Sequence, residues 1–411
     1  MSENTYTFFD GGVTSPAGFC AAGVAAGIKK EGLDMALLYS EVPCVLAGTF
    51  TTNLVKAAPV KWDRRILEEH GMAQAVVINS GIANAATGAE GMERCEKTAA
   101  AASEALGIDK ELVLTASTGV IGAQLPMDKI CLGTAKLAGK LTADREGAVL
   151  AASAIMTTDT ERKEAAVKFT CAGKTVTIGG MSKGSGMIHP NMCTMLAFIT
   201  TDAAISQPML QKALSECVNE SFNMITVDGD TSTNDTCLVM ASGLAGNTLI
   251  GSEGEDYNAF LGALKALTIY LAKKMAGDGE GATALFEVIV EGASDKESAA
   301  KMARAVAGSN LVKTAIAGHD ANWGRILCAM GYSGAFFEED KVDLYFESAS
   351  GKIQIAEGGV STGYSEEEAT RILSDPEVTA RIVLGMGDAE AAAWGCDLTH
   401  EYISINADYR S

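Results

Sequence analysis

The chain has 411 residues, of which 47% are hydrophobic and 20% are charged, so it can bury a large core and does not belong to the disordered class. Its formal net charge is −20 and it has no run of Lys or Arg, which argues against nucleic-acid binding and against adhesion to anionic membranes. The ten cysteines stand singly beside only four histidines, so we expect reduced thiols, no zinc site and no disulfide framework.

Strands and helices alternate along the first half of the chain, with glycine-rich turns between them. Pro126 suits the first turn of one helix, and Ala172-Gly173 marks the turn of a hairpin. The expected strands are 35–39, 45–50, 74–79 and 112–116, the expected helices are 60–69, 89–106 and 145–155, and the hairpin covers 167–178.

The same alternation continues in the second half. The expected strands are 195–200, 237–241, 284–291, 311–317, 342–348 and 378–384, and the expected helices are 207–220, 255–275 and 295–307. Alternating strands and helices predict an α/β or α+β class. No Pro/Ser-rich linker marks a domain boundary.

The stretch 183–202, KGSGMIHPNMCTMLAFITTD, combines a glycine turn, a Pro-Asn break and an apolar run that is typical of a buried strand. Two nucleophile types, Cys193 and Thr194, stand where the loop meets that strand. Taken alone, a threonine at a strand start and a buried cysteine are more often structural. The lysine, glycines and proline crowded into the loop favour a functional role, because an ordinary connection needs less backbone specification.

The segment GGMSKGSGMIHPNMCTMLAFITTDA resembles the ornithine acetyltransferase family of arginine biosynthesis, also called bifunctional glutamate N-acetyltransferase. The resemblance covers essentially the whole chain. Its other motifs are, in order, GGVTSPAGFCAAGVAAGIK, TASTGVIGAQLP, IMTTDT, DGDTSTNDT, GDGEGATALFEV, GHDANWGRI and the final INADYRS.

The resemblance implies a layered fold in which sheets are sandwiched between helices, similar in outline to the N-terminal nucleophile hydrolases. It also implies self-cleavage between Cys193 and Thr194, which divides the chain into 1–193 and 194–411, and an assembly of two chains of each kind. The family more often has alanine at the position of Cys193. Cys193 and a nucleophile assisted by His189 therefore remain alternatives to Thr194.

A threonine hydroxyl needs a base within hydrogen-bond reach before it can attack a carbonyl. Cleavage would give Thr194 a free α-amine with an ordinary pKa of about 7.7–8, which could act as that base. Acyl transfer also needs donors aimed at the oxyanion. Thr118-Gly119 stands in a tight turn after a strand, and the resemblance assigns this pair to the oxyanion hole.

Lys183 and Glu280 stand in two glycine-flanked loops and have opposite charges. An α-amino acid carries a carboxylate and an ammonium, so its site needs one partner of each sign. Thr158 stands beside Thr157 and is an alternative to it. The substrate-binding residues that the resemblance implies are Thr157, Lys183, Thr194, Glu280, Asn406 and the terminal Ser411.

The resemblance implies an acetyltransferase that moves the acetyl group from N2-acetyl-L-ornithine to L-glutamate through acetyl-Thr194. No cofactor or metal is needed, and use of acetyl-CoA as a second acetyl donor is left open. We expect small-molecule substrates, no nucleic acid, no membrane and a cytoplasmic location, since the N-terminus has no basic or long apolar segment. The alternatives are a self-processing amidohydrolase or aminopeptidase with a threonine nucleophile, and a non-catalytic small-molecule-binding protein.

Overall fold

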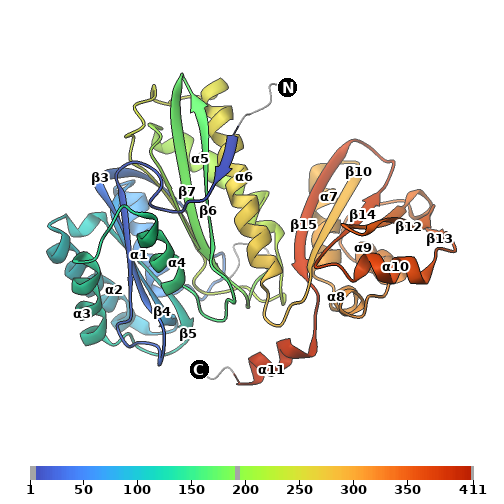
Figure 1. Cartoon of the computed structure of the whole chain (residues 1–411), viewed down its shortest axis with the longest axis horizontal. Coiled ribbons are helices and arrows are strands. Elements are labelled where there is room, and N and C mark those ends of the chain that lie inside the picture. The colour runs from blue at the N-terminus through green and yellow to red at the C-terminus, as the bar shows by residue number, and fades with distance from the viewer. Residues whose placement is uncertain (1–5, 190–194, 409–411) are drawn as a thin grey trace.

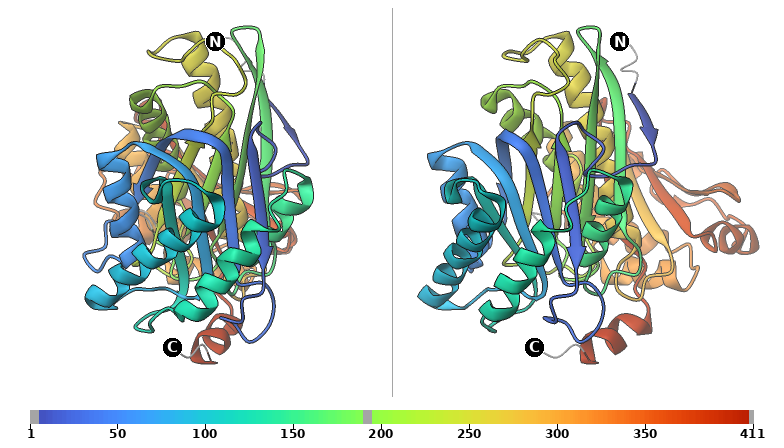
Figure 2. Two further views of the ribbon diagram at one scale, coloured as in Figure 1. Left: turned by 90° about the vertical axis from the view of Figure 1, so that its left-hand side faces the viewer. Right: turned by 60° about the vertical axis from the view of Figure 1, so that its left-hand side comes forward.

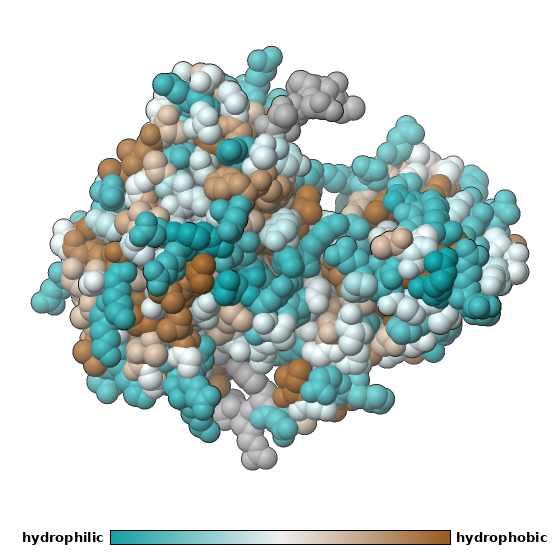
Figure 3. Space-filling view, in the orientation of Figure 1, coloured by the Kyte–Doolittle hydropathy of each residue, from teal (hydrophilic) through white to brown (hydrophobic). Residues whose placement is uncertain are grey.

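The computed structural model describes residues 6–189 and 195–408 (Figure 1). In this part of the chain the strands form two sheets, one of nine strands and one of six. The nine-stranded sheet and its helices make the larger body, and the six-stranded sheet makes a lobe beside it (Figure 1). In the space-filling view polar side chains spread over both parts, and a notch separates them at the top (Figure 3).

The nine-stranded sheet joins segments from both halves of the chain. Its spatial order is β1 (Tyr6–Phe9), β6 (Lys163–Cys171), β7 (Lys174–Lys183), β8 (Leu196–Thr201), β9 (Thr236–Ala241), β3 (Met35–Phe50), β4 (Met72–Ile82) and β5 (Val113–Val120), and β2 (Phe19–Val24) pairs with β3. The central strands β8 and β9 run parallel and every residue in them is buried. Their unbroken apolar runs are typical of strands that are covered on both faces.

Side chains of β8 alternate between two cores, as the period of two in a strand requires. Leu196 and Phe198 belong to a core beneath α1 (Ala58–Glu69), α2 (Gly88–Leu106), α3 (Met127–Ala138) and α4 (Arg145–Ala154). Ala197 and Ile199 belong to the core on the opposite face, beneath α5 (Gln207–Asn219) and α6 (Glu255–Gly277). The sheet is therefore covered by helices on both faces (Figure 2).

The six-stranded sheet continues the second core. Its order is β13 (Val360–Ser361), β12 (Gly351–Glu357), β11 (Asp343–Ser348), β14 (Glu377–Val383), β10 (Leu285–Ala293) and β15 (Ala389–Cys396). Helix α6 contacts β10 and β15 as well as β6 and β7, so it lies between the two sheets (Figure 1). Helix α7 (Lys296–Ala307) covers β10 and β15, α9 (Trp323–Gly331) packs on α7, and α10 (Glu366–Leu373) packs on β11 and β12.

The mixed α/β class with layered sheets and helices is confirmed, and the structure adds that α6 lies between the sheets. The strand expected at 311–317 is wrong, because Asn310–Ala317 forms helix α8. The Ser309 side chain accepts a hydrogen bond from the backbone N–H of Val312, which caps the helix start. Val312, Ala315 and Ile316 then face the core at helical spacing.

The last described element, α11 (His400–Asp408), stands apart from both cores and has no buried residue (Figure 1). Thr399, just before it, donates its hydroxyl to the Gly281 carbonyl at 2.6 Å. The chain end is thereby brought back to the loop that joins α6 to β10. No described helix is long and apolar enough to cross a membrane.

Candidate active site

A small cavity of about 120 Å³ lies where loops from distant parts of the chain meet. We call it the charged pocket. Its lining residues come from the end of β5, the segment after α4, the end of β7, the loop before β9, the loop after α6, and α11. They are Ala83, Thr118, Gly119, Ile121, Thr157, Thr158, Lys183, Gly186, Met187, Ser232, Thr233, Asn234, Glu280 and Asn406.

Every expected oxyanion or substrate residue that the structure describes lines this pocket: Thr118, Gly119, Thr157, Lys183, Glu280 and Asn406. Thr158, the alternative to Thr157, lines it too. Cys193, Thr194 and Ser411 lie outside the described residues, so the nucleophile, the cleavage position and the chain-end contact stay predictions. His189 is not one of the lining residues, and its Nδ1 lies 3.3 Å from the Thr226 hydroxyl.

The Thr118-Gly119 turn ends β5 where that strand runs parallel to β4, with Gly119 level with Gly81. Gly119 has φ +129°, and a Cβ there would lie 2.3 Å from the Gly81 carbonyl carbon. Only glycine fits this conformation and this close approach. The Thr118 hydroxyl is buried and accepts a hydrogen bond from Lys183 Nζ at 3.5 Å.

Lys183 ends β7 and reaches the pocket with a side chain that is only 4% exposed. Its Nζ lies 3.9 Å from Asp159 Oδ2. Burial lowers the pKa of Lys183 below its ordinary value, and the Asp159 carboxylate opposes that shift. Burial alone would raise the pKa of Asp159, but the ammonium groups of Lys183 and Lys163 hold it below its usual range.

Glu280 enters the pocket from the loop after α6, where its backbone N–H donates to the Ser185 carbonyl at 2.8 Å. Its carboxylate accepts a hydrogen bond of 2.7 Å from Asn406 Nδ2 of α11. One turn earlier on α11, the Tyr402 hydroxyl donates to Asp228 at 3.2 Å. These two polar contacts place the otherwise exposed helix against the pocket rim.

The two adjacent threonines have different partners. The Thr158 hydroxyl lies 2.7 Å from the Ser185 hydroxyl. Thr157 donates its backbone N–H to Asp159 at 2.9 Å and is half-buried at the pocket. Because both line the cavity, the structure keeps both as candidate contacts.

One wall of the pocket is not among the residues expected from the sequence; it is formed by Ser232, Thr233 and Asn234. Asn234 Nδ2 donates to the carbonyls of Ala83 and Ser117 at 2.6 and 2.8 Å, which ties the loop before β9 to the ends of β4 and β5. The available signal was the motif DGDTSTNDT, whose crowded small polar residues lie just before a buried strand.

Asp235, next in the same loop, is fully buried, and its Oδ1 accepts the backbone N–H of Met195 at 3.1 Å. Burial raises the pKa of Asp235 well above its ordinary value. The contact anchors the first described residue after the 190–194 gap beside the pocket.

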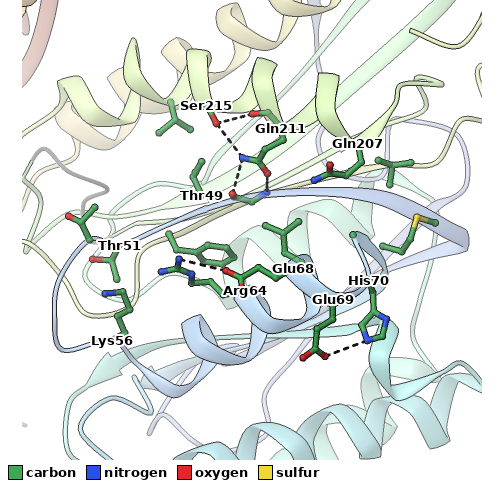
Figure 4. Close-up of a pocket in the computed structure, with 18 of the residues that line it drawn as sticks. Thr49, Thr51, Lys56, Arg64, Glu68, Glu69, His70, Gln207, Gln211 and Ser215 are labelled. Atoms are coloured by element: carbon green, nitrogen blue, oxygen red, sulfur yellow. Dashed lines mark hydrogen bonds and ion pairs between the residues drawn. The ribbon is translucent and has the colours of Figure 1, made fainter. Parts of the chain in front are cut away.

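A much larger hollow lies elsewhere, between α1 and α5 (Figure 4). We call it the α1–α5 groove; its volume is about 1210 Å³. Gln211 of α5 lines it and uses its amide to bond the backbone N–H and C=O of Gly48 at 3.0 and 3.1 Å. None of the expected site residues that the structure describes lines this groove.

One group of described residues has metal-ligand geometry: Glu69, His70 and Glu111, whose ligand atoms lie within 4.8 Å of one another. Arg65 forms ion pairs of 2.8 Å with both carboxylates, so its guanidinium already balances their charge. Every cysteine that the structure describes is unpaired.

Comparison with known proteins decides the family. A model of the ArgJ family matches residues 20–411. The chain belongs to the ArgJ family. The ArgJ relative from Symbiobacterium thermophilum, named arginine biosynthesis bifunctional protein ArgJ, is 55% identical over 404 residues, which cover 98% of this chain and 99% of that protein. The protein of the same name from Thermotoga neapolitana is 49% identical over 96% of this chain and 99% of its own length.

Solved structures include ArgJ from Bacillus halodurans, titled arginine biosynthesis bifunctional protein, at 49% identity with a TM-score of 0.49 over 52% of this chain and 98% of that chain. A second is the ornithine acetyltransferase from Mycobacterium tuberculosis, solved with ornithine, at 41% identity with a TM-score of 0.42 over 47% of this chain and 100% of that chain. The expected resemblance is confirmed by the ArgJ match and by the full-length relatives.

Proposed function

We propose that this protein is an acetyltransferase of arginine biosynthesis that moves the acetyl group of N2-acetyl-L-ornithine to L-glutamate. Membership of the ArgJ family and the names of its full-length relatives support this function. The observation that carries it is the charged pocket, where a lysine, a carboxylate and a Thr-Gly turn from separate parts of the chain meet.

The pocket residues suit an acylated α-amino acid. Lys183 and Glu280 supply one charge of each sign, which matches the carboxylate and the side-chain ammonium of acetylornithine. The Thr118 hydroxyl and the Gly119 N–H are the proposed donors to the oxyanion. Thr157 or Thr158, Asn406 and Ser411 complete the proposed substrate contacts.

Thr194 is the proposed nucleophile. Its Oγ attacks the acetyl carbon, its own α-amine takes the hydroxyl proton, and that proton passes to the departing ornithine nitrogen as the C–N bond breaks. The neutral amine of glutamate then attacks the acetyl-threonine ester, and the Thr194 α-amine takes a proton from that nitrogen and passes it to Thr194 Oγ as the C–O bond breaks. The acetyl group passes through the protein, so the reaction needs no cofactor.

The α-amine of Thr194 requires self-cleavage after Cys193, giving chains 1–193 and 194–411. In the nine-stranded sheet, β8 and β9 of the proposed second chain lie between β7 and β3 of the first. The two chains would therefore stay joined by backbone ladders on both sides of β8–β9 after the cut. We further propose an assembly of two chains of each kind.

The relatives are named bifunctional, which favours a second reaction, and acetyl-CoA is the acetyl donor we propose for it. A cytoplasmic location fits the unpaired cysteines that the structure describes. The acetyl-CoA reaction is tested by N-acetylglutamate formation from glutamate when acetyl-CoA replaces acetylornithine.

The test of the nucleophile compares Thr194→Ala with Cys193→Ala. We expect Thr194→Ala to remain one 42.6 kDa chain without acetyl transfer, and Cys193→Ala to be cleaved and active. N-terminal sequencing of the second chain of the native protein should begin at Thr194. A folded, cleaved Cys193→Ala protein without activity would transfer the role to the cysteine.

The alternatives are separated by ornithine release with and without glutamate. An acetyltransferase releases ornithine rapidly only when glutamate accepts the acetyl group. A hydrolase of the same self-processing kind would release it equally well without glutamate, because water is its acceptor. A binding protein would release none and would have no reason to be cleaved.

A further inference from the structure

Four charged side chains form a buried cluster behind the charged pocket. They are Asp159, Lys163, Lys183 and Asp278, and their side chains are 0%, 0%, 4% and 6% exposed. Two are cations and two are anions. Of the four, only Lys183 lines the pocket.

Asp159 is the centre of this cluster. Its Oδ1 accepts hydrogen bonds from Lys163 Nζ and from the Gly184 backbone N–H, both at 2.7 Å. Its Oδ2 accepts the Thr157 backbone N–H at 2.9 Å and lies 3.9 Å from Lys183 Nζ. One carboxylate thus holds two pocket segments, at Thr157 and at Lys183–Gly184, in fixed relation.

Lys163 extends the cluster to the loop that bears Glu280. Its Nζ bonds Asp278 as well as Asp159. Asp278 also accepts the Thr160 backbone N–H at 3.0 Å, and it stands two residues before Glu280. Besides the backbone bond from Glu280 to Ser185, Lys163 thus links the two loops that present opposite charges to the pocket.

We infer that Asp159 is a positioning residue that holds the Lys183 ammonium in place and keeps it positively charged for the substrate carboxylate. The positive charge of Lys163 opposes the second of these effects. The inference rests on the proposed function, in which Lys183 binds that carboxylate. A buried ammonium is costly unless an anion lies close to it, and Asp159 is the nearest carboxylate that the structure gives Lys183.

The charges that face Lys183 have opposing effects on its pKa. Burial, the largest cause, lowers it; Asp159 raises it and Lys163 lowers it. Among the described residues, Glu280 and Asp235 also face Lys183 and raise its pKa, and Lys29 is near enough to interact with it. Removing Asp159 should thus favour the neutral amine, and removing Lys163 should favour the ammonium.

The experiment measures acetyl transfer from acetylornithine to glutamate between pH 6.5 and 9.5 in the native protein and in Asp159→Asn. We expect the variant to be cleaved, to have a KM for acetylornithine raised roughly tenfold, as for loss of one charge-assisted contact, and to keep most of its kcat. The ratio of native to variant kcat/KM should grow with pH, because Lys183 loses its proton more readily in the variant. The alkaline limb of the variant's kcat/KM profile therefore lies at lower pH.

Asp202→Asn is the matched control. Asp202 is also buried and also accepts two backbone N–H groups, from Ala17 and Thr177, but it follows the end of β8 opposite to the pocket. The control should leave KM and the alkaline limb unchanged.

Lys163→Met should shift the alkaline limb of kcat/KM in the opposite direction to Asp159→Asn. With its positive charge gone, the alkaline limb should move to higher pH, whereas a merely structural cluster would shift both variants alike. The inference would be overturned if the alkaline limb of kcat/KM moved equally in both variants. It would also be overturned if folded Asp159→Asn kept the native KM and the native alkaline limb, or if neither variant folded. A native protein that transfers no acetyl group would instead overturn the proposed function, and the inference with it.

Discussion

The charged pocket and the α1–α5 groove differ most in where their charged side chains lie. The groove is the larger hollow, about 1210 Å³ against about 120 Å³. Its Arg64 and Glu68 are 46% and 69% exposed and pair with each other at 3.8 Å (Figure 4). In the pocket, Lys183 is 4% exposed and is held by a carboxylate that is fully buried.

This difference teaches that burial of charge, rather than volume of the hollow, marks the charged pocket as the candidate site. Exposed pairs in the groove are screened by water and contribute roughly 0–1 kcal/mol. A buried charge is kept only where a partner compensates it, and such strongly shifted groups gather at functional sites. The predictions below separate the two regions, beginning with the largest expected effect.

Thr118→Ala should lower kcat about 100- to 1000-fold, the usual loss for one oxyanion donor. The measurement is steady-state acetyl transfer with protein whose cleavage has been checked on a denaturing gel, because maturation is itself an acyl transfer. Thr49→Ala in the groove is the control and should leave kcat unchanged. An unaltered kcat in cleaved Thr118→Ala would remove Thr118 from the reaction.

Glu280→Gln should raise the KM for acetylornithine about 10- to 100-fold, since one charge-assisted contact contributes about 1.5–3 kcal/mol. The amide can still meet Asn406, so the change tests the charge more than the packing. Glu68→Gln makes the same replacement in the groove and should leave KM within error. Similar KM changes in the two variants would contradict the distinction between the regions.

Gln211→Ala should reduce the free energy of unfolding by about 1–2 kcal/mol, because its side chain makes two hydrogen bonds to Gly48. Denaturant unfolding measures this change. The kinetic constants should stay the same, because the groove is structural in this interpretation. A changed KM with little loss of stability would give the groove a role in the reaction.

Asp63→Asn should have a small effect on the free energy of unfolding, and the sign of that effect should depend on pH. Asp63 of α1 is buried and accepts one hydrogen bond from the Thr115 N–H. Burial raises its pKa well above the ordinary value, so the folded state keeps a proton that the unfolded state loses. Native stability falls as pH rises from about 4 toward the folded pKa, and the neutral asparagine avoids this loss.

The variant should therefore gain stability relative to the native protein between pH 5 and pH 8, with no change in KM. Urea unfolding at the two pH values measures the gain. A stability difference that is constant or shrinks with rising pH would show that Asp63 stays charged in the folded protein.

The sequence by itself determined which residues are suited to the chemistry. Local features include the glycine at position 119, the opposite charges of Lys183 and Glu280, and a thiol and a hydroxyl just before an apolar run. They follow from backbone geometry and side-chain type, which the sequence carries directly. The buried strand β8 was predicted for the same reason, because its apolar run is continuous.

The sequence does not distinguish a strand from a helix in a short apolar segment such as 311–317. Its apolar residues fit either a strand or a helix, and the Ser309 cap at helix α8 decided between them. The order of the sheet and helix layers could not be predicted from the sequence either. Periodicity shows which side of an element is apolar, but not which element packs against that side.

Only the tertiary structure decided the convergence of the site. Thr118, Lys183, Glu280 and Asn406 are brought together by sheet pairing, by the return of the chain after α6, and by the contact of α11 with Glu280. The buried role of Asp159 was equally hidden, because in sequence it is one acidic residue after two threonines. Its burial depends on Lys163 and Gly184 at once, and pairings between distant segments are set by packing rather than by local pattern.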